Sequence, residues 1–254
     1  MNVTIPNDPQ QLKRDFDRDG FVVIRAFVRG AELDDLQREI ARYIARIPRL
    51  PRTDVMYEDR ERPESLKQLA HMKQNDAFFA SLIERPNWIS VAELLLADKA
   101  IPQEVEWFNK VPGRNAATPP HQDGYYFMLE PNEAVTMWLA LDPVDESNGC
   151  LRYVPQSHRC GTRPHGRTQV LGFSQGITDY SPKDRQAEQP IHAEPGDLLV
   201  HHAITIHRAD RNESERQRRS LGLIYYAART RQDVQKLAAY QRSLNEELQS
   251  AEKL

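Results

Sequence analysis

The chain has 254 residues, 39% hydrophobic and 28% charged, a balance typical of a globular protein with a substantial apolar core. Its 34 basic and 37 acidic side chains give a net charge of −3, which offers no basic surface for a nucleic-acid partner. Only two cysteines, no secretory signal pattern and no membrane-length apolar run are present, so we expect a cytoplasmic protein without a disulfide framework.

The first hundred residues have mostly helical patterns, interrupted by one short apolar strand. Residues 48 to 65 combine prolines with many charges, which indicates a loop. Capping residues and apolar spacing predict a helix from residue 8 to about residue 20, and a short strand, Phe21 to Ile24, follows it. The same patterns predict three further helices, Ala31 to Ile47, Asp76 to Glu84 and Trp88 to Leu96.

Short β-type runs broken by turns follow Pro102, a pattern that favours a barrel or a sandwich. The candidate strands are Val105 to Lys110, Ala134 to Leu141, Cys150 to Val154, Leu198 to His202 and Leu221 to Tyr226. Residues 161 to 190 form a long irregular stretch, and loops of that length are often lids or binding loops. The last segment, Asp233 to Leu254, has an amphipathic helical pattern.

We therefore expect a single domain over residues 1–254. It would consist of a helical part over about 1–100, a β core over about 101–228 and a C-terminal helix over about 232–252. No internal repeat divides the chain.

The run His121-Gln122-Asp123, together with His207, is a candidate metal site. In an extended segment, residues i and i+2 point to the same face, and Pro119-Pro120 favours extended backbone before the run. Two imidazoles and one carboxylate leave adjacent coordination positions open, which suits iron(II) in non-haem oxygenases. His-x-Asp alone is a common pattern, and His202 competes with His207, although we expect it to be packed or to orient a neighbour.

The chain resembles the phytanoyl-CoA dioxygenase family of iron(II)- and 2-oxoglutarate-dependent oxygenases. The resemblance covers roughly residues 105 to 228 in the family's order, and Asp19-Gly20-Phe21-Val22-Val23 resembles its N-terminal start. The matching stretches are Pro120-His121-Gln122-Asp123-Gly124, Met137 to Asp142, Asn148 to His158 and Pro195 to His202, followed by His207, Asn212 and Arg218-Arg219-Ser220-Leu221.

The resemblance implies a mainly β fold with flanking helices, built on a double-stranded β-helix, the jelly-roll or cupin-like barrel. It also implies that His121, Asp123 and His207 hold iron(II) and form the catalytic centre. The co-substrates would be 2-oxoglutarate and O2, with the 5-carboxylate of 2-oxoglutarate bound by Arg218. A planar guanidinium can grip a carboxylate through two parallel hydrogen bonds, which a lysine cannot do.

Arg218 and Arg219 compete for this role, because adjacent residues of a strand point to opposite faces. The family spacing selects Arg218. Strand alternation agrees, since Leu221 and Leu223 would share the face of Arg219 and leave Arg218 with Ser220.

Trp138 and Thr136 lie on one face of a predicted barrel strand and are expected to bind the co-substrate, since the family resemblance places Trp138 beside it. An ordinary core position for Trp138 fits the sequence equally well. The chain departs from the family pattern after His207, where many members carry Gly-Ser and this chain carries Arg208-Ala209. Ala209 lacks the hydroxyl that often helps to seat 2-oxoglutarate, and Arg208 could lie at the pocket entrance and favour an anionic substrate.

The expected reaction is hydroxylation of an unactivated C–H bond of a small molecule, with release of succinate and CO2. The alternatives are a desaturase or epimerase outcome, or a non-catalytic member of the same barrel family. Halogenation is disfavoured because Asp123 fills the position that a halide would need. The fold does not select the substrate. We expect the pocket lid to be formed by residues 48–75 and 161–190. We expect no membrane or nucleic-acid partner. The sequence leaves the oligomeric state open.

Overall fold

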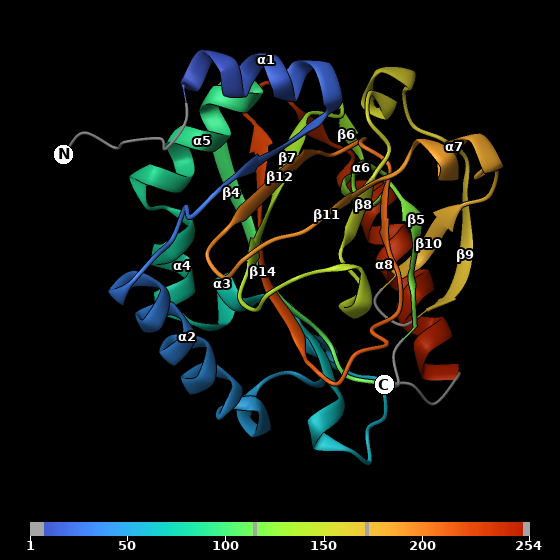
Figure 1. Cartoon of the computed structure of the whole chain (residues 1–254). Coiled ribbons are helices and arrows are strands. Elements are labelled where there is room, and N and C mark those ends of the chain that lie inside the picture. Colours follow the sequence, from blue (N-terminus) through green and yellow to red (C-terminus); the bar gives the residue numbers. More distant parts are fainter. Residues whose placement is uncertain (1–7, 114–115, 171–172, 251–254) are drawn as a thin grey trace.

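Two antiparallel sheets enclose the centre of the molecule in the structure, a computed structural model that describes residues 8–113, 116–170 and 173–250 (Figure 1). The larger sheet has seven strands, in spatial order β1 (Phe21–Ile24), β12 (Leu198–His202), β7 (Ala134–Ala140), β14 (Arg218–Ala227), β4 (Ala100–Lys110), β3 (Leu66–Leu69) and β2 (Val55–Tyr57). The smaller sheet has four, in the order β11 (Gln189–Ile191), β8 (Leu151–Tyr153), β13 (His207–Ala209) and β5 (Thr118–His121).

Two further pairs of strands lie outside these sheets. One is the ribbon of β9 (His165–Val170) and β10 (Phe173–Ile177), and the other joins β6 (Leu129–Glu130) to β15 (Arg231–Gln232). The ribbon lies beside the small sheet, close to β5.

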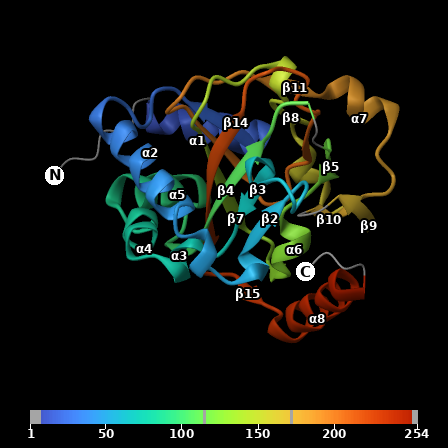
Figure 2. The ribbon, with the colours of Figure 1, turned by 90° about the horizontal axis from the view of Figure 1, so that it is seen from below.

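Helices α1 to α5 gather on one side of the large sheet, whereas α8 lies apart from them, near the β9–β10 ribbon (Figures 1 and 2). The helices are α1 (Pro9–Asp19), α2 (Ala31–Ile44), α3 (Met72–Asn75), α4 (Ala77–Ile83), α5 (Pro86–Leu96), α6 (Gly124–Phe127), α7 (Pro182–Ala187) and α8 (Val234–Ser250). Within the described residues, none of these helices is long and apolar enough to cross a membrane.

Strand alternation divides the large sheet into an apolar outer face and a mixed inner face. On β4 and β14, the outward side chains Val105, Trp107, Leu221 and Leu223 are buried in one core with the residues of α4 and α5. Burying each such side chain stabilises the fold by roughly 1.5–3 kcal/mol. The alternate residues face the small sheet and are free to line a site.

The predicted helices and strands are confirmed, with three corrections. The α2 helix ends at Ile44 rather than Ile47, because Pro48 lies in a 3-10 turn over Ile47–Arg49. The predicted loop 48–65 contains β2, and the predicted irregular stretch 161–190 contains the β9–β10 ribbon and α7. The C-terminal helix is present as α8, while residues 251–254 of the prediction lie outside the described residues.

Candidate metal centre and co-substrate pocket

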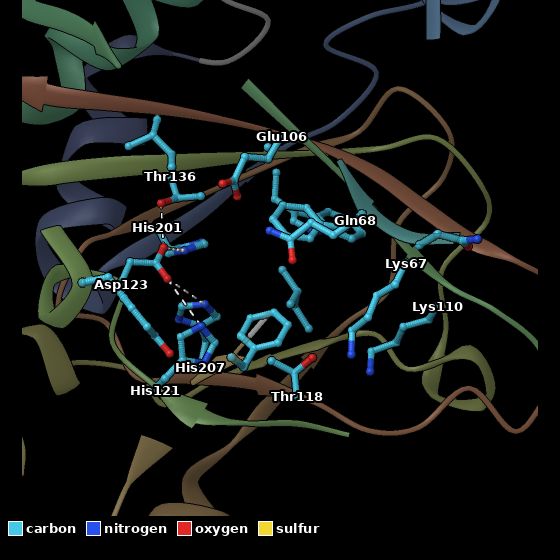
Figure 3. Close-up of a pocket in the computed structure, with 18 of the residues that line it drawn as sticks. Lys67, Gln68, Glu106, Lys110, Thr118, His121, Asp123, Thr136, His201 and His207 are labelled. Carbon is cyan, nitrogen blue, oxygen red and sulfur yellow. Dashed lines mark hydrogen bonds and ion pairs between the residues drawn. The ribbon is translucent and has the colours of Figure 1, made fainter. Parts of the chain in front are cut away.

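A cavity of about 270 Å³ lies between the two sheets. Its walls come from inward-facing residues of both sheets, from α6 and from the β9–β10 ribbon. Figure 3 shows Asp123 with His121, His201 and His207 at one end, and Lys67 and Lys110 at the other. The predicted site residues His121, Asp123, Thr136, Trp138, His207 and Arg218 all line this cavity.

A turn, not a strand, brings His121 and Asp123 together, which corrects the predicted extended geometry. Strand β5 ends at His121, and Asp123 has the helical angles φ −56° and ψ −36° at the start of α6. Gln122 between them is fully buried. Its side-chain amide donates to the carbonyl oxygens of Gly161 and Ile204 and accepts from the backbone N–H of Arg163. These three hydrogen bonds fix the turn and so the direction of both neighbouring side chains.

His207 opens β13, since β12 ends at His202 and a turn separates the two strands. In the antiparallel pairing of β13 with β5, His207 lies directly opposite His121. Paired residues of neighbouring strands project from the same face, and the centroids of the two imidazole rings are 4.2 Å apart.

The ring nitrogens of both histidines are arranged as metal ligands require. His121 Nδ1 lies 2.8 Å from the carbonyl oxygen of Pro119, and His207 Nδ1 lies 3.1 Å from that of Thr205. Since a carbonyl can only accept, each Nδ1 carries the proton and each Nε2 keeps its lone pair. The two Nε2 atoms lie 3.4 and 3.6 Å from Asp123 Oδ1.

The second carboxylate oxygen of Asp123 is held by the protein. Thr136 Oγ1 donates to Asp123 Oδ2 at 2.6 Å, and His201 Nε2 lies 3.0 Å from the same oxygen. Tyr153 Oη lies 2.9 Å from the other nitrogen of His201. Burial holds the pKa of Tyr153 well above its ordinary value, so its hydroxyl donates to Nδ1 and leaves the Nε2 proton for Asp123. Oδ1 is thereby left to face His121 and His207.

Charge states at this end of the cavity also suit a cation. Burial would raise the pKa of Asp123, but the three neighbouring imidazoles of His207, His121 and His201 hold that pKa well below its ordinary value. Burial, with His121 and His201 nearby, holds the pKa of His207 well below its usual range. A charged carboxylate and a neutral imidazole are the forms that bind a metal ion.

His121, Asp123 and His207 each offer one ligand atom, and these atoms lie within 4.8 Å of one another. Two nitrogens and one oxygen, without a thiolate, form the donor set that suits non-haem iron(II). The residues present therefore fit an iron ion.

Arg218 is a buried cation without a carboxylate partner among the described residues. It is 4% exposed, its Nε makes no hydrogen bond, and its guanidinium carbon lies 5.2 Å from the ring centroid of Trp138. Burial lowers its pKa to about 10, so it stays charged at neutral pH. Burying a charge without a partner costs free energy, which indicates that the Arg218 guanidinium is placed to bind an anionic ligand.

Arg219, by contrast, is bound from outside the cavity by Asp142, with Nε–Oδ2 and Nη2–Oδ1 distances of 2.9 and 2.6 Å. Arg218 and Arg219 therefore point to opposite faces of β14, as strand alternation predicts. Lys110 lies directly opposite Arg218 on β4 and also lines the cavity. Burial, with Arg218 and Lys67 nearby, lowers the pKa of Lys110 well below its ordinary value.

Arg208 does not lie at the cavity, contrary to the prediction. Its neighbour His207 takes the inner face of β13, so Arg208 points to the opposite face, where it binds Glu188 and Asp210. Of the two segments expected to contact the pocket, 48–75 contributes Glu58, Lys67 and Gln68, and 161–190 contributes Phe173.

His201, rather than His202, orients the site. Leu199 and His201 face the space between the sheets, whereas Leu198, Val200 and His202 face outward, where His202 packs near Phe16 and His158. The sequence showed that adjacent histidines must take opposite faces, but no signal in it showed which face was the inner one. Tyr153 and Gln122, the other two residues that set the geometry, were not predicted to act there.

Replacing His201 by Phe should weaken metal binding by about 10- to 100-fold, the usual cost of losing a hydrogen bond that orients a ligand. Calorimetric titration of the protein with Mn(II) under nitrogen would measure the change. His202→Phe is the matched control, since His202 touches none of the three candidate ligands, and its Mn(II) affinity should stay within twofold of wild type. Equal losses in both variants would contradict the assigned role.

Glu106 is a second acid that lines the cavity; it is half-buried and has no hydrogen-bond or ion-pair partner among the described residues. Burial, reinforced by the charges of Glu104 and Asp123, raises its pKa to about 8. The unfolded value is about 4.3, so between these pH values the folded chain binds more protons than the unfolded one, and stability falls as pH rises.

Glu106→Gln should therefore raise the unfolding free energy of the metal-free protein above pH 8, on the order of a few kcal/mol, with little effect near pH 4. Urea denaturation at a series of pH values would measure the effect. Glu61→Gln, at an exposed position, serves as the control. A stability difference that does not change with pH would contradict the buried-acid assignment.

Comparison with known proteins agrees with this geometry. The family model described as "Phytanoyl-CoA dioxygenase (PhyH)" matches residues 16–220. The peroxisomal phytanoyl-CoA dioxygenase of Bos taurus is 27% identical over 226 residues, which are 83% of this chain and 66% of that protein. The chain thus spans about two thirds of the length of this curated relative.

Solved structures show the same fold. The epimerase SnoN, in complex with Fe3+, alpha ketoglutarate and nogalamycin RO, superposes with a TM-score of 0.71 at 22% identity, covering 88% of this chain and 86% of that one. EctD from S. alaskensis with bound Fe superposes with a TM-score of 0.72 at 18% identity, covering 89% and 79%. The predicted jelly-roll barrel is confirmed.

Proposed function

Since the chain belongs to the phytanoyl-CoA dioxygenase family of non-haem iron, 2-oxoglutarate-dependent dioxygenases, we propose that it hydroxylates an unactivated C–H bond of a small molecule. Succinate and CO2 would be the co-products. The predicted family, enzyme class and cofactors agree with the family match and with the Fe- and 2-oxoglutarate-bound structures that share its fold.

One observation carries the proposal. Two imidazoles with free Nε2 lone pairs and one carboxylate form a cluster in the cavity. A buried guanidinium without a carboxylate partner among the described residues lines the same cavity. The first group fits a metal ion, and the second fits a carboxylate. A small dicarboxylic keto acid is the molecule whose two ends match both.

We assign His121, Asp123 and His207 as the iron ligands and Arg218 as the residue that binds the distal carboxylate of 2-oxoglutarate. Iron(II) with 2-oxoglutarate, when bound, supplies the activation of O2 that leads to insertion of one oxygen atom into the substrate. Thr136 and His201 hold Oδ2 of Asp123, so that Oδ1 alone faces the imidazoles. In this assignment, Thr136 acts through Asp123, and Trp138 packs against the guanidinium of Arg218.

The β9–β10 ribbon closes the cavity next to the metal end. Phe173 on this ribbon lies 5.2 Å from the ring of His121, centroid to centroid. Tyr126 Oη donates to the carbonyl oxygen of Gln175 at 2.8 Å and accepts from the N–H of the same residue at 3.1 Å, which ties the ribbon to α6. An aromatic wall of this kind keeps bulk water away from the reacting C–H bond.

The test is O2 consumption by the protein with iron(II) and 2-oxoglutarate, with succinate measured alongside. Slow turnover without substrate, abolished by a chelator and accelerated by some members of a small-molecule panel, is the expected result. Product mass then decides the outcome: a gain of one oxygen supports hydroxylation, whereas a loss of two hydrogens indicates desaturation and an unchanged mass indicates epimerisation. Absence of turnover under every condition would favour the non-catalytic alternative.

The partner that this cavity suits is a small molecule, and we propose the cytoplasm as the place of action. Two observations support that location: Cys150 and Cys160 are both free thiols, and Cys160 is exposed. Exposed thiols are usual where the compartment is reducing.

A further inference from the structure

Glu106 differs from the other acids of the cavity in having no partner. Among the described residues, the lining carboxylates are those of Glu58, Glu106 and Asp123. Glu58 forms an ion pair with Lys67, with 3.0 Å between Oε1 and Nζ, and Asp123 belongs to the candidate metal centre. Glu106 has neither a hydrogen bond nor an ion pair in the part of the chain that the structure describes. Its carboxyl group is therefore available to a ligand.

A second acceptor without a partner also lines the cavity. Gln68 is 6% exposed, and its Oε1 is buried without a hydrogen-bond partner among the described residues. Burying an amide oxygen without a donor costs free energy. This oxygen therefore fits a donor that a ligand brings into the cavity.

The sheet register places these two acceptors on one face of neighbouring strands. Gln68 on β3 pairs with Phe108 on β4, so their side chains project from the same face. Glu106 lies two residues before Phe108 and shares that face. Gln68 and Glu106 are thus diagonal neighbours, whose Cβ atoms are typically roughly 7–8 Å apart, within reach of one small polar group between two long side chains.

The surroundings of Glu106 are those of a site for positive charge. The nearest charged groups that act on its carboxyl group include two acids, Glu104 and Asp123, and one base, His71. Figure 3 shows Glu106 nearer to Asp123, whereas the lysines of the cavity lie at the opposite end. The cations that would bind a dicarboxylic co-substrate are therefore not placed to neutralise Glu106.

We propose that the substrate carries a primary ammonium group, which donates hydrogen bonds to the carboxylate of Glu106 and to Oε1 of Gln68. This inference rests on the proposed function and names the class of substrate. An ammonium group has three donors and no acceptor, which matches two carboxylate oxygens and one amide oxygen that lack other donors. Phe108, Phe127 and Ile224 also line the cavity and suit the carbon chain that would carry the ammonium group.

The experiment is calorimetric titration of the protein loaded with Mn(II) and 2-oxoglutarate under nitrogen, so that binding is measured without turnover. The probes are butylamine, hexylamine and benzylamine, each compared with the alcohol of the same carbon skeleton. At about pH 8.5 a primary ammonium group is still charged, and Glu106, with a pKa of about 8, is ionised. At least one amine should bind about tenfold or more tightly than its alcohol, as expected for hydrogen bonds between charged groups.

Two variants test the two acceptors separately. Glu106→Gln should abolish the preference for the amine over the alcohol, because the carboxylate is lost while the shape is kept. Glu106→Met takes its place should that variant not fold. Gln68→Met, which keeps the length of the side chain and removes the amide oxygen, should reduce the preference without abolishing it.

Glu104→Gln is the matched control. It removes an acid from the same face of β4, but Glu104 lies outside the cavity lining, and its Oε1 accepts from the backbone N–H of Val105 at 2.8 Å. This variant should keep the wild-type preference. No preference for any amine in the wild-type protein, a preference that survives E106Q, or an equal loss in E104Q would overturn the assignment. A wild-type protein that binds neither Mn(II) nor 2-oxoglutarate would instead overturn the proposed function.

Discussion

His121→Ala is expected to abolish 2-oxoglutarate turnover, with succinate formation falling by more than about a hundredfold. Loss of an outer hydrogen bond to a ligand already costs 10- to 100-fold, and this change removes one of three candidate ligand atoms. Succinate release and Mn(II) affinity should fall together, because both depend on the same nitrogen. The fold should persist, since the imidazole lies at the cavity wall and β5 keeps its backbone pairing with β13.

The matched control is His192→Ala, which removes an imidazole that lies outside the cavity and is 60% exposed. This variant should retain wild-type turnover and metal affinity. Full activity in the His121→Ala protein would refute the ligand assignment, and loss of Mn(II) binding in both variants would point to a general effect on folding.

Arg218→Lys is expected to raise the KM for 2-oxoglutarate by about a hundredfold, although the charge is kept. A lysine cannot form the two parallel hydrogen bonds of a guanidinium fork, and imperfect pairing of a buried charge costs about 2–5 kcal/mol. Steady-state kinetics with 2-oxoglutarate varied, together with anaerobic binding titration, would measure the change. The affinity for Mn(II) should stay close to wild type, because Arg218 is not among the candidate ligands.

Arg219→Lys is the neighbouring control. Its guanidinium is bound by Asp142 and lies on the opposite face of β14, so the KM for 2-oxoglutarate should change by less than about twofold. If the two lysine variants behaved alike, the choice of Arg218 over Arg219 would be wrong.

The sequence predicted most of the barrel because its strands alternate regularly. On β14, Leu221 and Leu223 point to the helices, so Arg218 had to point to the cavity, as the structure shows. The strands β2 and β3 were missed because they have only three and four residues, too few to show alternation, and β2 lies in a stretch rich in proline and charge. All four residues of β3 are buried, including Lys67 and Gln68, since this strand is covered on both faces.

The arrangement of the ligands was harder to predict than their identity. His121 and Asp123 come together through a turn that Gln122 holds by contacts with Gly161, Arg163 and Ile204, all remote in sequence. The same holds for His201, whose role depends on Tyr153 and on which side of β12 the small sheet lies. Local patterns carry no information on such contacts, because they exist only after the sheets have come together.

The hydrogen bonds of Gln122 also separate two parts of the protein that can change independently. The chain that enters the β9–β10 ribbon is attached at Gly161 and Arg163 to the residue between two candidate ligands. The attachment extends to His165, whose Nε2 accepts a hydrogen bond from the backbone N–H of Gln122 at 3.2 Å. Libraries that vary residues 166–174 and retain Gln122 and His165 are therefore a direct route to altered substrate preference on an unchanged catalytic frame.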